Sequence, residues 1–272
     1  DAGHGIAGFE VKYTLENSNQ VFLGSSLQDQ LTMDFGSQLG WRKQTQKAGI
    51  FQLGYLFTGV PAEVWEDPYL AGASRKATER DSRGARFVWD RIMGSAFELT
   101  AQVRDIDVHR ERSGSDPSLD CHVECQASLD RSGDQYQLWL SYLIVKKGGH
   151  IFRPQIRYRQ SDSDGDATSK DAYALQLSYS YMNPRWTLVS NVVYGQSRYD
   201  RSNPLYGYKQ DTDTIVLDAT VLYRLPIKGG RWQALGSVFW GDADSDIDFH
   251  DSELNQILLG VIYNFGNQPG LR

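Results

Sequence analysis

The sequence contains no uninterrupted run approaching the roughly 18 apolar residues that a transmembrane helix requires. Only 40% of its 272 residues are hydrophobic, and the mean hydropathy is −0.49. It also lacks an excess of basic residues, since the net charge is −6 and the pI is near 5.4. These absences argue against a helical membrane protein and against a nucleic-acid partner. They leave open a transmembrane β-barrel, in which only alternate residues meet lipid.

Cysteine is also scarce. The two cysteines, Cys121 and Cys125, lie close together in the longest polar segment. Their spacing is compatible with half of a metal site, whose other half is missing, or with a local disulfide. We expect the disulfide, formed in an oxidising compartment, and we expect no metal and no cofactor.

An alternation of apolar and polar residues recurs about thirteen times along the chain. At the C-terminal end, Ile257, Leu259, Val261, Tyr263 and Phe265 fall on one face of a strand, and more polar residues fall on the other. Aromatic residues make up 12% of the chain, which suits the girdles of a membrane barrel. The pattern predicts an all-β, transmembrane, antiparallel up-and-down β-barrel. The expected strands are residues 8–15, 20–25, 32–43, 49–58, 83–91, 96–106, 135–146, 151–160, 172–182, 186–196, 213–225, 231–241 and 254–265.

Short and long connections alternate between these strands. Short turns are expected at 44–48, 93–96, 147–150, 183–185 and 226–230, all at one end of the barrel, with long loops at the other end. Bacterial single-chain barrels have even strand numbers, so we expect about 14 strands when intact, 13 of them in this chain. One strand is then expected upstream of a single barrel domain over residues 1–272. The sequence shows no signal peptide, so we expect either that one was cleaved or that the sequence begins inside the mature chain. The alternatives are 12 strands, if 20–25 is loop, and a soluble β-sandwich, which also alternates apolar and polar residues.

The polar face carries charges that alternation directs into the lumen. A charge facing lipid near the midplane would cost about 2–4 kcal/mol. Three arginines on one strand, Arg153, Arg157 and Arg159, are expected to form a basic ladder that attracts anions. Alternatively, the arginines pair with acidic residues and fill the barrel. The predicted lining residues are Lys12, Asp34, Arg42, Arg86, Asp90, Glu98, Arg104, Arg153, Arg157, Arg159 and Asp218.

Four loop segments are weaker candidates. The acidic stretches 162–166 and 242–248 are compatible with weak Ca²⁺ or Mg²⁺ binding, but neither matches the twelve-residue calcium loop. The cluster at 248–252 contains aspartate, histidine and serine, yet neighbouring strand residues point to opposite sides, so we expect no catalytic group there. Residues 63–70 are expected either to fold inward as a constriction or to pack on the rim.

Several segments resemble an uncharacterised family of proteobacterial outer-membrane proteins. They are FLGSSL (22–27), DPYL (67–70), RKATER (75–80), WDR (89–91), NPLYGYKQDTD (203–213) and DIDFHDS (246–252). The resemblance covers most of the chain, from about residue 8 to 265. It implies an outer-membrane barrel and implies no activity.

From these observations we expect a monomeric, non-enzymatic, porin-like channel in the bacterial outer membrane, which passes small polar solutes by diffusion. Its expected partners are outer-membrane lipid, lipopolysaccharide and those solutes, with no nucleic acid. The alternatives are a plugged barrel that serves in binding, adhesion or assembly, and, less favoured, a hydrolase located at the rim.

Overall fold

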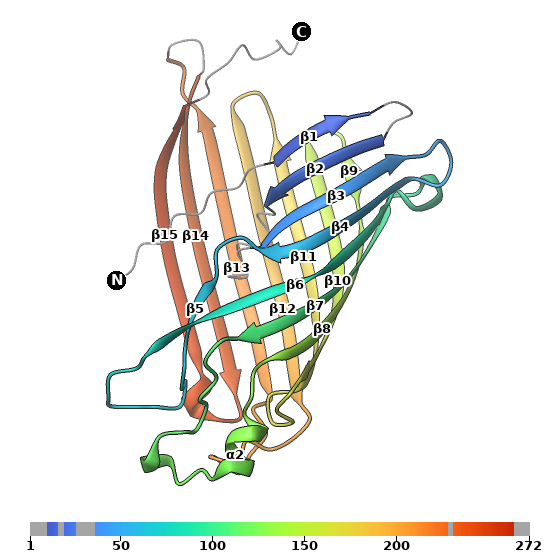
Figure 1. The fold of residues 1–272 in the computed structure, drawn as a ribbon. Coiled ribbons are helices and arrows are strands. Elements are labelled where there is room, and N and C mark those ends of the chain that lie inside the picture. Colours follow the sequence, from blue (N-terminus) through green and yellow to red (C-terminus); the bar gives the residue numbers. More distant parts are fainter. Residues whose placement is uncertain (1–9, 16–18, 26–35, 228–230, 264–272) are drawn as a thin grey trace. The chain divides into compact units, whose positions relative to one another are not determined.

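The computed structural model describes residues 10–15, 19–25, 36–227 and 231–263. They form one antiparallel sheet in which each strand pairs with the next along the chain, apart from two short additions (Figure 1). The thirteen strands of this path are β1 (Glu10–Thr14), β2 (Asn19–Ser25), β3 (Gly36–Gln44), β4 (Ile50–Thr58), β6 (Ala77–Asp90), β7 (Phe97–Val108), β8 (Gly133–Tyr142), β10 (His150–Ser163), β11 (Lys170–Met182), β12 (Trp186–Tyr199), β13 (Thr212–Arg224), β14 (Trp232–Ser245) and β15 (Ser252–Tyr263).

The remaining elements are short. Strand β5 (Ala62–Trp65) pairs with β6, and β9 (Ile144–Lys146) pairs with β10. Helix α2 (Val123–Ser128) and the 3₁₀ turns η1 (Ile92–Gly94), η2 (Pro117–Leu119) and η4 (Asp248–His250) lie in connections. None of the helices in the described part of the chain is long and apolar enough to cross a membrane.

The described residues fall into two compact units. The first comprises those within 1–140, 157–173 and 197–211, and the second those within 141–156, 174–196 and 212–272.

In the first unit, the strands expose their apolar face. On β8, Tyr136, Leu138 and Leu140 are 40–47% exposed, whereas Gln135 on the opposite face is 9% exposed. We call the face that carries the buried polar residues the inner face. A water-soluble sheet buries its apolar face, so this inverted pattern requires lipid as the surrounding medium.

The second unit repeats this pattern on its own strands. On β11, Tyr173 lies at the end of the first unit, and Leu175 and Leu177 of the second unit continue the exposed apolar row. Strands β13, β14 and β15 pair in a regular register, from Thr212 opposite Ser245 to Trp232 opposite Tyr263. The predicted all-β, up-and-down barrel class is confirmed. The exposed apolar rows on the strands of both units match the lipid-facing surface of antiparallel membrane barrels, so the protein is a bacterial outer-membrane protein.

The short turns gather at one end within each unit. In the first unit, the β3–β4 and β6–β7 turns touch, since the Met93 N–H and the Trp89 indole N–H both donate to the Ala48 carbonyl, at 3.3 and 2.7 Å. Gly49 of this turn has φ +102°, and a Cβ there would lie 2.4 Å from the Arg91 carbonyl oxygen, so only glycine fits. In the second unit, Met182 N donates to the Gly149 carbonyl at 2.9 Å and Arg224 N to the Arg185 carbonyl at 2.8 Å. The turn topology expected from the sequence holds in both units, although 228–230 lie outside the described residues.

Residues 20–25 form the expected strand, β2, which is paired on both sides, so the twelve-strand alternative is wrong. Two other strands differ from expectation in a way that has a physical reason. Strand β6 begins at Ala77 and not at 83, because Glu79, Asp81 and Arg83 occupy its outer face there and hide the apolar alternation. The expected strand 135–146 ends at Tyr142, and its last residues form the separate strand β9.

Candidate functional site

The inner face of the first unit is polar and packed. Its side chains pack closely, so that each of six polar residues exposes less than a tenth of its surface. They are Gln38 (6%), Ser82 (7%), Arg86 (6%), Thr100 (5%), Gln102 (4%) and Arg104 (2%). Two apolar residues, Phe22 (5%) and Leu56 (2%), are buried as well.

Two arginines of this face bind amides on the neighbouring strand. Arg42 lies directly opposite Gln52, and its Nε and Nη2 donate to Gln52 Oε1 at 3.0 and 2.8 Å. Arg86 lies opposite Gln102, and its Nε donates to Gln102 Oε1 at 2.7 Å. A glutamine acceptor is neutral, so these hydrogen bonds orient the guanidinium groups without cancelling their charge.

Two guanidinium groups share one indole ring. The Arg86 Cζ lies 5.6 Å and the Arg157 Cζ 5.7 Å from the centre of the Trp139 ring. These distances are within the range of a cation–π interaction. We call Arg86, Trp139 and Arg157 the arginine–tryptophan cluster. It brings together strands β6, β8 and β10 within the first unit.

Of the other predicted lining residues, Arg153 and Arg159 on β10 are exposed, as is Lys12 on β1. Asp90 lies 3.7 Å from Arg91 and directly opposite Glu98 across β6–β7, near the turn. Asp34 lies outside the described residues. The pore-lining role of these residues stays a prediction.

The second unit has its own polar network on the inner face. Asn191 Nδ2 donates to Asp218 Oδ1 at 2.8 Å, and Gln176 Nε2 donates to Asn191 Oδ1 at 3.2 Å. Thr220 and Ser237 share a hydrogen bond at 2.9 Å across β13–β14. Asp218 is thus held by an amide, and all five side chains are half-buried.

The long loops of the first unit form a folded assembly, which we call the loop cap and define as residues 59–76, 109–132, 164–169 and 200–211. It has a small hydrophobic core of its own, consisting of Tyr69, Cys121, Leu129 and Ala167. Leu129 is fully buried, and Tyr69 is 5% exposed. Helix α2 belongs to this cap (Figure 1).

The predicted disulfide between Cys121 and Cys125 is present and ties the chain just before α2 to the first turn of that helix, with the two Cα atoms 5.4 Å apart. Cys121 is 8% exposed and belongs to the core of the cap. The bond therefore fixes α2 against the apolar centre of the loops.

Asp67 organises two loops through backbone donors. Its Oδ1 accepts from the N–H of Tyr69 at 3.0 Å and of Gly114 at 3.1 Å, and its Oδ2 accepts from the N–H of Asp116 at 3.3 Å. Residues 63–70 are accordingly packed into the cap. Two hydrogen bonds from Ser118 lower the pKa of the Asp116 carboxyl.

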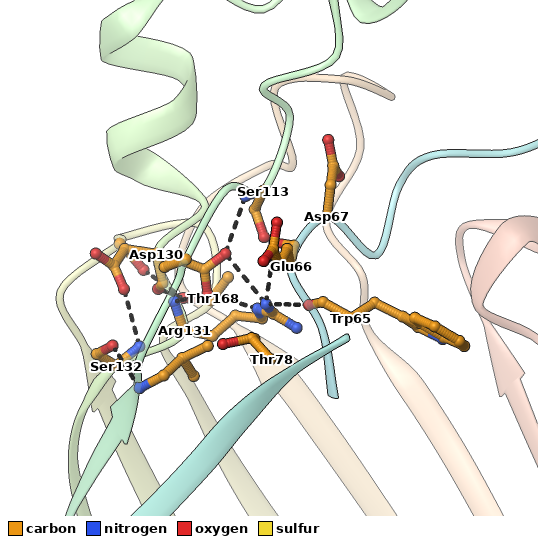
Figure 2. A network of polar contacts seen from close by, with 12 residues as sticks. Trp65, Glu66, Asp67, Thr78, Ser113, Asp130, Arg131, Ser132 and Thr168 are labelled. Atoms are coloured by element: carbon orange, nitrogen blue, oxygen red, sulfur yellow. Dashed lines mark hydrogen bonds and ion pairs between the residues drawn. The ribbon is translucent and has the colours of Figure 1, made fainter. Parts of the chain in front are cut away.

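Arg131 joins two segments of the cap, 59–76 and 109–132, as Figure 2 shows. Its Nε donates to Glu111 Oε2 at 2.6 Å, and its Nη2 donates to the Trp65 carbonyl at 2.7 Å. The side chains of Arg131 and Glu111 are 24% and 12% exposed, so the ion pair is mostly shielded from water. A second pair, Arg110 with Glu66 at 3.0 Å, ties the same loops.

Tyr69 and Asn203 close the cap from the far side. The Asn203 amide donates to the Tyr69 hydroxyl at 3.1 Å, and Asn203 is 1% exposed. Burial raises the pKa of the Tyr69 hydroxyl to about 12, since the ionised form would lose hydration. Ala167 N donates to the Ser128 carbonyl at 2.9 Å, which adds the 164–169 segment.

The acidic and histidine-containing loop segments that the sequence suggested as weaker candidate sites are held by hydrogen bonds within the loops. The segment 162–166 is bound through its backbone, with Asp164 N donating to the Ser132 carbonyl at 2.8 Å. Among the described residues, no group of three or more histidine, cysteine, aspartate or glutamate side chains is arranged to hold a metal ion. In the 248–252 cluster, Asp251 Oδ1 accepts from Ser245 N at 2.8 Å and so fixes the loop.

Sequence reasoning overlooked Trp139, Gln102, Arg131 and Glu111. Trp139 falls on the polar face of its strand, which is an unusual place for tryptophan. This position in the alternation could have identified it as a candidate site residue. Nothing in the sequence pairs Arg131 with Glu111, because their contact depends on how the loop folds. Asn203 lies in one of the segments that carry the family resemblance, and its burial explains why that segment needs an amide.

No curated protein matches the chain. Among solved structures, it is similar to in-vitro folded OmpT, an outer membrane protein of Vibrio cholerae, at 9% sequence identity and a TM-score of 0.43. The match covers 94% of this chain and 88% of that chain.

The family described as "Protein of unknown function (DUF2860)" matches residues 3–264, which is nearly the whole chain. The protein therefore belongs to the DUF2860 family.

Proposed function

We propose that this outer-membrane protein is a narrow, porin-like channel that passes small polar solutes and favours anions. The observation that carries the proposal is the arginine–tryptophan cluster, in which two guanidinium groups from different strands meet over one ring. Arginine stays protonated at any physiological pH, so these charges are permanent. In a confined interior they raise the local concentration of anions.

The packing of the inner face supports a narrow conduit over a wide one. Arg86, Gln102 and Arg104 are each less than a tenth exposed, so side chains occupy much of the space at their level. The hydrogen bond from Arg86 to Gln102 holds this guanidinium by a neutral acceptor. We propose that the cluster is a constriction, that the solutes are small, and that the protein is a monomer without catalytic activity in contact with lipid and lipopolysaccharide.

Planar-bilayer recording of the refolded protein tests the proposal. We expect single-channel steps and, under a KCl gradient, a reversal potential displaced toward the chloride equilibrium potential. Selective passage of cations would contradict the anion preference, and absence of conductance from heat-modifiable, folded protein would contradict the channel.

The second candidate is a closed barrel that binds a partner through its loops. The observation that favours it is the loop cap, which has a hydrophobic core, a disulfide and the shielded Arg131–Glu111 pair, unlike simple solvated loops. Deletion of residues 115–130 separates the two functions. If the cap closes a channel, the deletion increases conductance, whereas a closed barrel stays silent with or without it.

A further inference from the structure

We infer that Trp139 is the positioning residue that sets the charge selectivity of the constriction. This inference rests on the proposed function and deepens it. Trp139 projects from β8, and its ring lies under guanidinium groups of β6 and β10. In the sheet order β6 and β8 are separated by β7, so Arg86 reaches past its neighbouring strand to the ring.

The indole ring offsets the repulsion between the two guanidinium groups. Two guanidinium groups on one inner face repel each other, and in a confined interior this repulsion is screened less than in water. The face of an indole ring has negative electrostatic potential and attracts both cations. Trp139 therefore holds Arg86 and Arg157 at a common site from which repulsion would otherwise separate them.

Arg86 has a second contact, with strand β7. Arg86 is 6% exposed and is oriented by Gln102, whereas Arg157 is half-buried. The ring is a contact that the two arginines share. Its loss leaves both charges in the protein but removes their common position, so selectivity changes while the net charge does not.

Substitution of the ring provides the test. Trp139→Phe retains a cation-binding face, and we expect the wild-type ratio of chloride to potassium permeability. Trp139→Leu removes the face, and we expect the ratio to fall by roughly two- to tenfold toward unity. Trp186→Leu is the matched control, because Trp186 belongs to the second unit, where its ring lies tilted against Tyr223 with the ring centres 4.3 Å apart. We expect this substitution to leave the ratio unchanged. An unchanged ratio in Trp139→Leu overturns the inference.

A fluorescence measurement keeps the inference testable if the wild type does not conduct. The difference between wild-type and Trp139→Phe emission isolates Trp139. We expect iodide to quench this emission more strongly than caesium, and the preference to vanish in the Arg86→Gln/Arg157→Gln double variant. Equal quenching by the two ions, or no quenching by either, contradicts the role of Trp139. A silent wild type with the iodide preference intact would contradict only the channel.

Discussion

The side-chain amide of Asn203 donates a hydrogen bond to the hydroxyl of Tyr69 at 3.1 Å, although 134 residues of chain separate them. The bond joins the 59–76 and 200–211 segments at the core of the loop cap. Tyr69 also tilts over Tyr206, with the ring centres 6.3 Å apart. The cap is thus held by contacts between loops that leave the sheet far apart in sequence.

Asn203→Ala should loosen the cap without unfolding the strands. The variant leaves the buried Tyr69 hydroxyl without this donor, at an expected cost of about 1–3 kcal/mol. Limited proteolysis should cleave the loops faster while the strand core stays resistant. Tyr208→Phe, at a residue 69% exposed, is the control. Equal cleavage rates in Asn203→Ala and wild type would show that the hydrogen bond does not stabilise the loop cap.

Stability of the cap should fall at alkaline pH because of Tyr69. Its folded-state pKa is raised from 10.0 to about 12, so the stabilisation is complete below pH 10 and is lost as the pH rises through 12. Two pKa units correspond to about 2–3 kcal/mol. Comparing urea unfolding at pH 9 and pH 12 should reveal this loss in wild type and a smaller one in Tyr69→Phe. The same alkaline loss in both proteins would assign it to other tyrosines.

Removal of the disulfide should have a modest effect. The Cys121–Cys125 loop is short, and the chain-entropy relation gives about 2 kcal/mol for its closure. We expect the Cys121→Ser/Cys125→Ser double variant to fold, with faster proteolysis near α2. Mass spectrometry after alkylation without reductant should find no modified cysteine in wild type, and alkylated thiols there would contradict the bond.

Arg131→Ala should destabilise the cap far more than Arg83→Ala. Arg131 and Glu111 are mostly buried, and removing one partner leaves a shielded charge, at a cost of roughly 3 kcal/mol. Arg83 pairs with Asp105 at 2.8 Å on an exposed surface, with side chains 74% and 46% exposed, so its loss should have little effect. Thermal unfolding of the two variants provides the comparison, and similar shifts would contradict the argument.

The arginines of β10 should tune selectivity without reversing it. Changing Arg153, Arg157 and Arg159 to Ser should reduce the anion preference in bilayer recordings. Each charge contributes about 1 kcal/mol at 4 Å in bulk water, so the expected result is a shift. The difference should shrink at 1 M salt, where screening acts within about 3 Å. Unchanged selectivity in a conducting triple variant would mean that these arginines have a structural role only.

The sequence by itself determined the strands and their order. On β4, Phe51, Leu53, Tyr55 and Phe57 alternate with smaller or polar residues, and the structure places them on the outer face. Alternation is a local property that survives in any register, so it can be read without knowing the partners. It failed at the start of β6, where the strand extends beyond the apolar stretch and charged residues occupy the outer face.

Only the tertiary structure decided which inner residues meet. The sequence indicated that Arg86 and Arg157 face inward, but their common contact with Trp139 depends on the register of four neighbouring strands. The contacts within the loop cap could not be predicted from the sequence at all, because Tyr69, Leu129 and Asn203 come from separate loops whose sequences have no periodicity. Local patterns specify a strand and its faces, whereas contacts between distant segments arise from packing that no local pattern encodes.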